Sequence, residues 1–291
     1  MAFSKIIADF SELPLSDDFM FGEIMRRPEL CKQFLEALLG KKIAKIKYIT
    51  KQQDISDSYT SHGIRIDVYL KDDLGTVYCI EMQTTGGILV LAKRIRYYQG
   101  AIDLHNLSKS ERYKKLPETF IIMICTMDLI GRGLAVYKRK VTFEGCEDYS
   151  YVDGTHVYLL NSDYTTANAD DKVLEFLHCV GTNETNAEKY NSQFMKDVCH
   201  AIVEVRSDPG KRDEYMTLQT RLMDAKEEGL EEGLERGREE GLERGREEGI
   251  QALVQTLQNL SVARDTVIQQ LEGQFGLPAD VAATKVAQYW T

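Results

Sequence analysis

Two acidic residues, Asp67 and Glu81, lie in a stretch whose pattern predicts a β-hairpin. Apolar residues alternate with polar or aromatic ones over residues 64–70, which is the period of a half-buried strand. Residues 71–75 contain two aspartates and a glycine and suit a hairpin loop, and residues 76–83 are rich in strand-forming side chains. The pattern therefore places the two carboxylates on neighbouring antiparallel strands.

The register of this hairpin decides how close the carboxylates come. If Leu70 lies opposite Thr76, Asp67 and Glu81 are diagonal neighbours on one face, with Cβ atoms within about 7–8 Å. Two such carboxylates can share Mg²⁺, which takes an octahedral shell of carboxylates, waters and phosphate oxygens, and the Met82 carbonyl could add a third protein ligand. A surface hairpin with ordinary solvated charges has the same pattern, so the spacing leaves both interpretations open.

Five short stretches follow one another in a recognisable order across roughly residues 15–225. They are Ser-Asp-Asp-Phe-Met-Phe-Gly at 16–22, Ile-Glu-Met-Gln at 80–83 after Asp67, Arg-Ile-Arg-Tyr-Tyr at 94–98, Phe-Ile-Ile-Met-Ile-Cys-Thr at 120–126, and Tyr-Met-Thr-Leu at 215–218. Together they resemble the Rpn family of recombination-promoting nucleases and putative transposases, an E-x-Q variant of the PD-(D/E)XK nuclease superfamily.

The resemblance implies a fold and an activity. The fold would be α/β, a restriction-endonuclease-like core with a central mixed β-sheet flanked by helices, followed by an α-helical C-terminal region. The activity would be that of a Mg²⁺-dependent DNA endonuclease linked to recombination or transposition, with Mn²⁺ or Ca²⁺ as substitutes. Asp67, Glu81 and the Met82 carbonyl would hold the metal, and Gln83 would position the attacking water. Most of the superfamily has lysine at the position of Gln83, and glutamine brings no positive charge to the phosphate.

Two other functions compete with this one. A DNA-binding or assembly protein with a weak or silent nuclease site is compatible with Gln83 and with the acidic chain. Plasmid nicking would separate that alternative from a nuclease. A glycosidase built on Asp67 and Glu81 is disfavoured, because no aromatic sugar-binding cleft is evident around the pair.

A helix over residues 88–104 is predicted by its apolar stripe, and Lys93, Arg94 and Arg96 lie near its start. In the nuclease interpretation these cations contact the DNA backbone, whereas otherwise they only solvate a surface. Lys45 and Lys47 belong to a predicted strand from Ile43 to Ile49. They could contact phosphates, or they could guard an exposed sheet edge against pairing.

The first predicted helix has Ser16 as its N-cap, with Asp17 and Asp18 in its first turn. In the superfamily this helix packs beside the metal site, so that Asp18 or Glu23 could lend a further acid. Both residues are also ordinary for a helix terminus or surface, and that simpler interpretation needs no function.

The division of the chain follows its composition. Residues 161–170 form a polar linker and the expected domain boundary. We expect a nuclease-like core over 1–165, a helical region packing on it over 166–225, a Glu/Gly/Arg repeat over 226–249 and short C-terminal helices over 250–291.

The formal net charge of −10 is unfavourable for generic DNA binding, but residues 226–249 alone contribute −5, from ten glutamates against four arginines and one lysine. The six cysteines are scattered without a C-x-x-C pair, which argues against a structural zinc site and fits a reducing cytoplasm. The longest apolar run, residues 120–125, is too short to span a membrane.

The octapeptide Glu-Glu-Gly-Leu-Glu-Arg-Gly-Arg occurs at 231–238 and again at 239–246. Six glycines recur every four residues from Gly229 to Gly249, at a cost of about 1 kcal/mol each in a helix. Ion pairs one turn apart return at most about 0.5 kcal/mol each. We therefore expect a solvated, marginal helix that serves as a spacer, with the apolar segments after Ile250 available to form a homo-oligomer.

Overall fold

The computed structural model describes residues 9–48, 53–55 and 64–290, and for residues 48, 53–55, 64 and 65 it describes the backbone only. The chain divides into two compact units, Met1–Tyr215 and Met216–Thr291. Each unit is described by itself.

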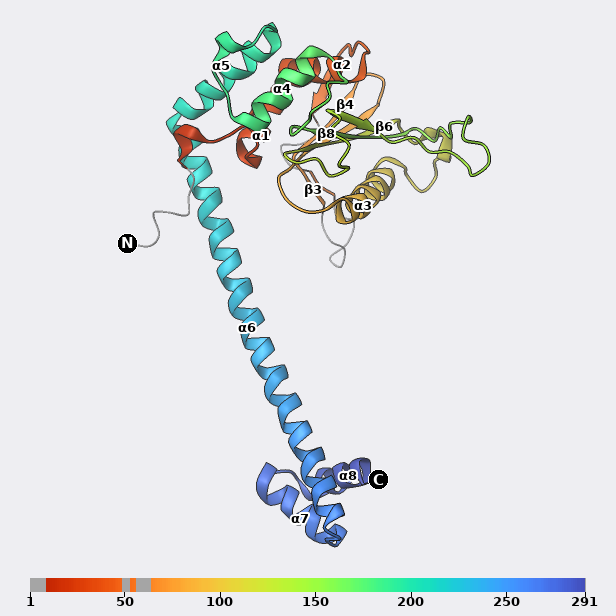
Figure 1. Ribbon diagram of the computed structural model, residues 1–291, viewed down its shortest axis with the longest axis vertical. Coiled ribbons are helices and arrows are strands. Elements are labelled where there is room, and N and C mark those ends of the chain that lie inside the picture. The colour runs from red at the N-terminus through yellow and green to blue at the C-terminus, as the bar shows by residue number, and fades with distance from the viewer. Residues whose placement is uncertain (1–8, 49–52, 56–63, 291) are drawn as a thin grey trace. The chain divides into compact units, whose positions relative to one another are not determined.

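The first unit is built on a mixed six-stranded sheet, as expected (Figure 1). The strand order is β1-β4-β5-β6-β8-β7, in which β5, β6 and β8 are parallel and their other neighbours antiparallel. The bounds are Ile46–Tyr48 for β1, Val68–Asp72 for β4, Val77–Gln83 for β5, Thr119–Cys125 for β6, Val136–Lys138 for β7 and Thr155–Asn161 for β8. A separate antiparallel pair is formed by β2, Gln53–Ile55, and β3, Ile64–Ile66.

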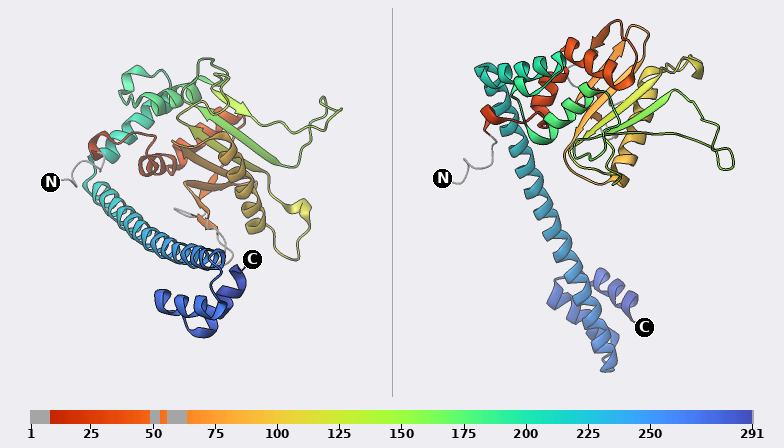
Figure 2. Two further views of the ribbon diagram at one scale, coloured as in Figure 1. Left: turned by 60° about the horizontal axis from the view of Figure 1, so that its bottom comes forward. Right: turned by 45° about the horizontal axis from the view of Figure 1, so that its top comes forward.

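Helices cover both faces of the sheet (Figures 1 and 2). One face carries α1, Asp18–Met25, α2, Pro28–Leu39, α4, Asp171–Thr182, and α5, Gln193–Ser207. The other face carries α3, Ile88–Asn106, whose buried residues Leu91, Ile95, Tyr98 and Ile102 are the predicted stripe. Every residue of β6 is buried, because helices cover its two faces and β5 and β8 flank it, which confirms a strand buried on both sides.

Three local expectations were wrong. The N-cap of α1 is Asp17, not Ser16, because the Asp17 carboxylate accepts from the backbone amide of Phe19 at 2.9 Å. The strand expected from Ile43 begins at Ile46, and Ile49 lies outside the described residues. The strand expected over residues 64–70 is interrupted, since β3 ends at Ile66 and β4 begins at Val68.

The boundary expected within residues 161–170 lies inside the first unit. Asn168 joins this segment to β7: its side chain accepts from the Val136 amide at 2.9 Å and donates to the Val136 carbonyl at 2.7 Å. The unit instead extends to Tyr215, whose ring packs 5.4 Å from Phe19. Helices α4 and α5 therefore share the hydrophobic core of the sheet.

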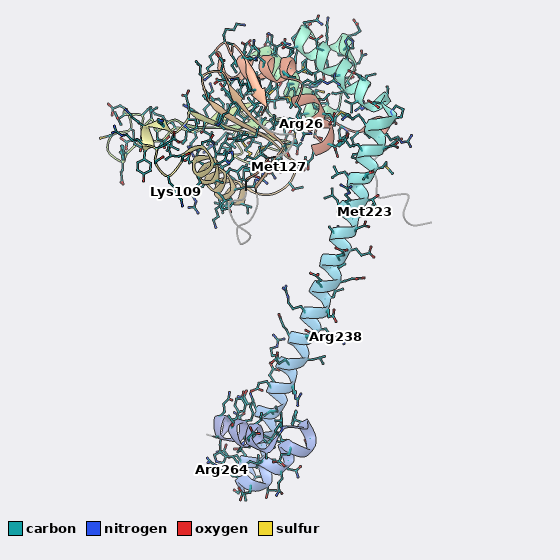
Figure 3. All side chains as sticks on the ribbon, turned by 180° about the vertical axis from the view of Figure 1, so that it is seen from behind. Arg26, Lys109, Met127, Met223, Arg238 and Arg264 are labelled. Carbon is teal, nitrogen blue, oxygen red and sulfur yellow. The ribbon has the colours of Figure 1, made fainter. Side chains whose placement is uncertain are left out.

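Helix α6, Pro209–Asn259, continues through the whole repeat. Side chains around Arg238 project into solvent on all sides (Figure 3). The second unit closes on its own hydrophobic cluster, in which the end of α6 packs with α7, Arg264–Phe275, and α8, Ala279–Tyr289. Within the part of the chain that the structure describes, no helix combines the length and the apolar character needed to cross a membrane.

Candidate active site

Asp67 and Glu81 meet where the hairpin of β4 and β5 opens. The strands pair Val68 with Ile80 and Tyr69 with Cys79, and Asp67, at the bend just before β4, lies beside Glu81, because its amide donates to Glu81 Oε1. The expected register is therefore wrong by two residues. A shift of two residues leaves every side chain of β4 and β5 on its expected face of the sheet.

Each of the two carboxylates accepts a hydrogen bond from a backbone amide. The Asp67 amide donates to Glu81 Oε1 at 3.0 Å, and the Met82 amide donates to Asp67 Oδ2 at 3.0 Å. Because the N–H and C=O of one strand residue point to the same neighbouring strand, the Met82 carbonyl also points towards the Asp67 side. The chain bends at Asp67, and β3 pairs with β2 instead of continuing beside β5.

Glu81 is a buried carboxylate whose charge its neighbours offset only in part. Glu81 is only 5% exposed. Burial raises its pKa well above the ordinary value, and the charge of Asp67 raises it further. The hydrogen bond from the Asp67 amide and the charge of Arg94 act in the opposite direction but do not cancel the rise.

This donor set fits a divalent metal ion that prefers oxygen ligands. It offers two carboxylates and a backbone carbonyl, with water or phosphate oxygens left to complete an octahedron. Among the described residues there is no group of three His, Cys, Asp or Glu side chains that could hold a metal, so a site with more side-chain ligands is not formed there.

Gln83 lies on the same face as Glu81, two residues further along β5. Its Oε1 accepts a hydrogen bond from Arg94, and its Nε2 donates to the carbonyl of Thr85. Both polar ends of the amide are therefore held by the protein. Arg94 is half-buried and its guanidinium lies 5.8 Å from the centre of the Tyr98 ring.

A family model described as PD-(D/E)XK nuclease family transposase matches residues 18–232. The chain belongs to this family. No curated protein and no solved structure matches the chain. The match confirms the resemblance drawn from the five motifs, and the mixed sheet flanked by helices is consistent with the PD-(D/E)XK fold.

The five predicted DNA-contacting residues of this PD-(D/E)XK protein do not gather in one place. Lys93 and Arg96 are exposed on α3, whereas Arg94 turns towards Gln83. Lys45 and Lys47 are exposed at the start of β1, an edge strand.

The two lysines lie towards the closed end of the hairpin, away from the carboxylates. Lys47 pairs with Lys71, which pairs with Val77, four residues or about 13 Å along the strand from Glu81. The Lys45 amide donates to the carboxylate of Asp73 in the hairpin turn, at 3.2 Å. This placement suits the alternative role, protection of a sheet edge, while phosphate contact by these lysines stays a prediction.

Sequence reasoning missed Arg26, which approaches the site from α1. Its Nη2 donates to the Asp67 carbonyl at 3.2 Å. Gly22, one turn earlier, leaves room for it, since a Cβ there would lie 2.9 Å from the guanidinium. A glycine inside an otherwise apolar helix was the available signal, because such a glycine usually has a packing reason.

The two acids of α1 differ in their surroundings. Glu23 forms an ion pair with Lys211 at 2.9 Å and lies 4.0 Å from Arg26. Asp18 adds to the negative potential that raises the pKa of Glu81. Of the two, Asp18 is thus the residue whose charge reaches the carboxylate pair, while Glu23 links helices of the first unit.

Proposed function

We propose that the chain is a Mg²⁺-dependent DNA endonuclease with Asp67 and Glu81 as metal ligands. One observation carries the proposal: Asp67, just before β4, lies beside Glu81 on β5, and Glu81 resists ionisation because of burial and the neighbouring charge. Folding therefore holds two carboxyl groups where ionising both of them is unfavourable. A divalent cation would offset that charge, and family membership supports a phosphodiester as the substrate.

When bound, Mg²⁺ would lower the pKa of a coordinated water and offset charge on the scissile phosphate. The residues of the chain would hold the metal ion and orient the attacking water. Asp67 and Glu81 present oxygens in a geometry fixed by backbone amides. The Met82 carbonyl is the third proposed ligand, and Gln83 is proposed to orient the attacking water. No covalent intermediate with the protein is required.

The test is nicking of supercoiled plasmid by the full chain, in Mg²⁺ and in EDTA. Wild type is expected to nick only with metal, and Asp67→Ala to be inactive. The matched control is Asp73→Ala, which removes an exposed aspartate from the far turn of the same hairpin and should nick like wild type. If Asp67→Ala nicks as fast as the control, the metal site is misassigned.

A second candidate function is DNA binding or assembly by a nuclease fold with a weak site. The observation that favours it is the engagement of both ends of the Gln83 amide by Arg94 and Thr85. Under this alternative, wild type retards DNA in a gel without nicking it in Mg²⁺ or Mn²⁺. A role in recombination, and a homo-oligomer formed through residues 250–291, are proposals that follow the family and the C-terminal unit. Sedimentation of the full chain and of a chain truncated after Gly249 tests the oligomer.

A further inference from the structure

Arg94 forms no ion pair among the residues that the structure describes. Its side chain is half-buried, and among the described residues no carboxylate lies within ion-pair distance of it. Its Nε is buried and has no hydrogen-bond partner there. Withdrawing a cation from water without a counter-ion is costly. Such a residue on α3 is therefore more than a solvated surface cation.

The surroundings of Arg94 place its charge beside the carboxylate pair. It donates to Gln83, whose side chain shares a face of β5 with Glu81. Its charge lowers the pKa of Glu81, and it acts in the same direction on the thiols of Cys79 and Cys125. The guanidinium thus lies among the side chains at the carboxyl ends of β5 and β6.

Gln83 is fixed in one orientation by its partners on both sides. The amide nitrogen donates to the Thr85 carbonyl in the turn that leads into α3, so the amide oxygen is left to accept from Arg94. The turn itself needs glycine, because Gly86 has a φ of 100°. Strand β5, the turn that follows it and helix α3 together hold Arg94 against Gln83.

We propose that Arg94 is a positioning residue that acts through Gln83 and supplies the positive charge which most of the superfamily obtains from a lysine on the strand itself. The ligand that this pair serves is a DNA phosphodiester, at its non-bridging oxygens. Arg94 holds the Gln83 amide in place, and its guanidinium brings one positive charge next to that amide. Lys93 and Arg96, on the exposed side of α3, contribute only to DNA affinity. This inference rests on the proposed nuclease activity.

The first experiment compares Arg94→Gln with Arg96→Gln, which removes the same charge from the exposed side of the same helix. Single-turnover nicking is measured over a range of plasmid concentrations. Arg94→Gln is expected to lose about 10²-fold in rate at saturating DNA, the usual effect of removing one charge-stabilising group. Arg96→Gln is expected to raise the DNA concentration needed for half-maximal rate. Equal effects of the two variants would overturn the assignment.

A second readout is independent of turnover. Calorimetric titration with Mn²⁺ should give Arg94→Gln an affinity equal to or tighter than that of wild type, because the variant removes a positive charge near the cation site. If Arg94 only supports the fold, its loss disorders the carboxylates and weakens Mn²⁺ binding, which would refute a role in charge placement.

The deciding variant moves the charge back to the strand. Gln83→Lys combined with Arg94→Gln should recover most of the nicking rate, whereas Arg94→Lys alone should recover part of it. Failure of the double variant to recover overturns the inference, provided that wild type nicks and Asp67→Ala does not. If wild type does not nick DNA, or if Asp67→Ala nicks as fast as wild type, the proposed nuclease function is wrong. That outcome differs from failure of the Arg94 assignment alone, in which wild type nicks, Asp67→Ala does not, and the double variant fails to recover.

Discussion

Replacing Glu81 by glutamine should make the metal-free protein more stable at pH 8. If the charges of Asp67 and Glu81 are taken to be about 5 Å apart, the Cβ spacing of cross-strand neighbours, they repel each other by about 3 kcal/mol at an effective dielectric constant near 20. Glutamine has the same size and keeps an oxygen that can accept from the Asp67 amide. Loss of the charged acceptor costs about 1 kcal/mol. The expected net gain in unfolding free energy is about 2 kcal/mol.

The sign of the pH dependence follows from the direction of the pKa shift. Burial and the Asp67 charge raise the pKa of Glu81 in the folded state. Above the ordinary pKa of about 4.3, the unfolded chain releases a proton that the folded chain retains. Stability therefore falls as the pH rises through the window between the ordinary and the raised pKa. The gain from Glu81→Gln should be present at pH 8 and vanish towards pH 4.

Thermal unfolding in EDTA, followed by circular dichroism, measures this effect. A gain of about 2 kcal/mol corresponds to a rise in Tm of about 4–8 °C for a unit of this size. Mg²⁺ at about 100 times its Kd should stabilise wild type by about 2.7 kcal/mol and the variant far less.

The control is Glu36→Gln, at a carboxylate that accepts from the Ile43 amide at 2.8 Å and from Lys42. Burial is the largest single effect on Glu36 and raises its pKa, but the hydrogen bonds from Ile43 and Lys42 and the charges of Lys42 and Lys32 together lower the pKa below its ordinary value. This substitution should destabilise the protein at pH 8. The reasoning is refuted if Glu81→Gln lowers stability at pH 8, or if its gain is the same at every pH.

Two further substitutions and one deletion test other parts of the molecule. Gly22→Ala should leave the free energy of unfolding unchanged or raise it by about 1 kcal/mol, because alanine has the higher helix propensity. The same substitution should lower the nicking rate, because the new Cβ displaces the Arg26 side chain. A nicking rate equal to that of wild type would show that Arg26 has no part in the reaction. Asp128→Ala removes the acceptor of three backbone amides and a tyrosine hydroxyl after β6, and should cost about 2 kcal/mol in urea unfolding; no loss would show that the loop is held by other contacts. Deletion of residues 231–246 removes two whole octads and should leave metal-dependent nicking intact; loss of nicking with unchanged circular dichroism would make the repeat part of the catalytic assembly.

The sequence predicted the hairpin and its acidic face because period-two alternation depends only on local pleating. It did not predict the register, since a shift of two residues leaves that alternation unchanged. Nor did it predict the bend at Asp67, where Ile66 packs in the core beside α3 while Val68 packs in the opposite core. The register and the bend both depend on the partner strands. Strand β4 pairs with β1 and β5, whereas β3 pairs with β2.

The position of Arg94 against Gln83 shows a different limit. In the sequence, Lys93, Arg94 and Arg96 are three neighbouring cations with nothing to distinguish them. The helical period shows which of them faces the sheet only when the buried side of the helix is known. The polar segment 161–170 resembled a linker because its residues are hydrophilic, but Asn168 uses that polarity to extend the hydrogen bonding of β7. Composition indicates where polar groups occur, whereas their partners come from tertiary structure.

The hydrogen bonds from the Asp67 amide to Glu81 and from the Met82 amide to Asp67 have a consequence for the kinetics and heat of the proposed ion binding. Each carboxylate is oriented by an amide of the opposing segment, so capture of a cation does not have to order the chain. Association should then be limited by the loss of water from the ion, and the heat capacity of binding should change little, because almost no apolar surface is buried in the step. A site assembled from loops would instead fold around its ion, with a large negative heat-capacity change.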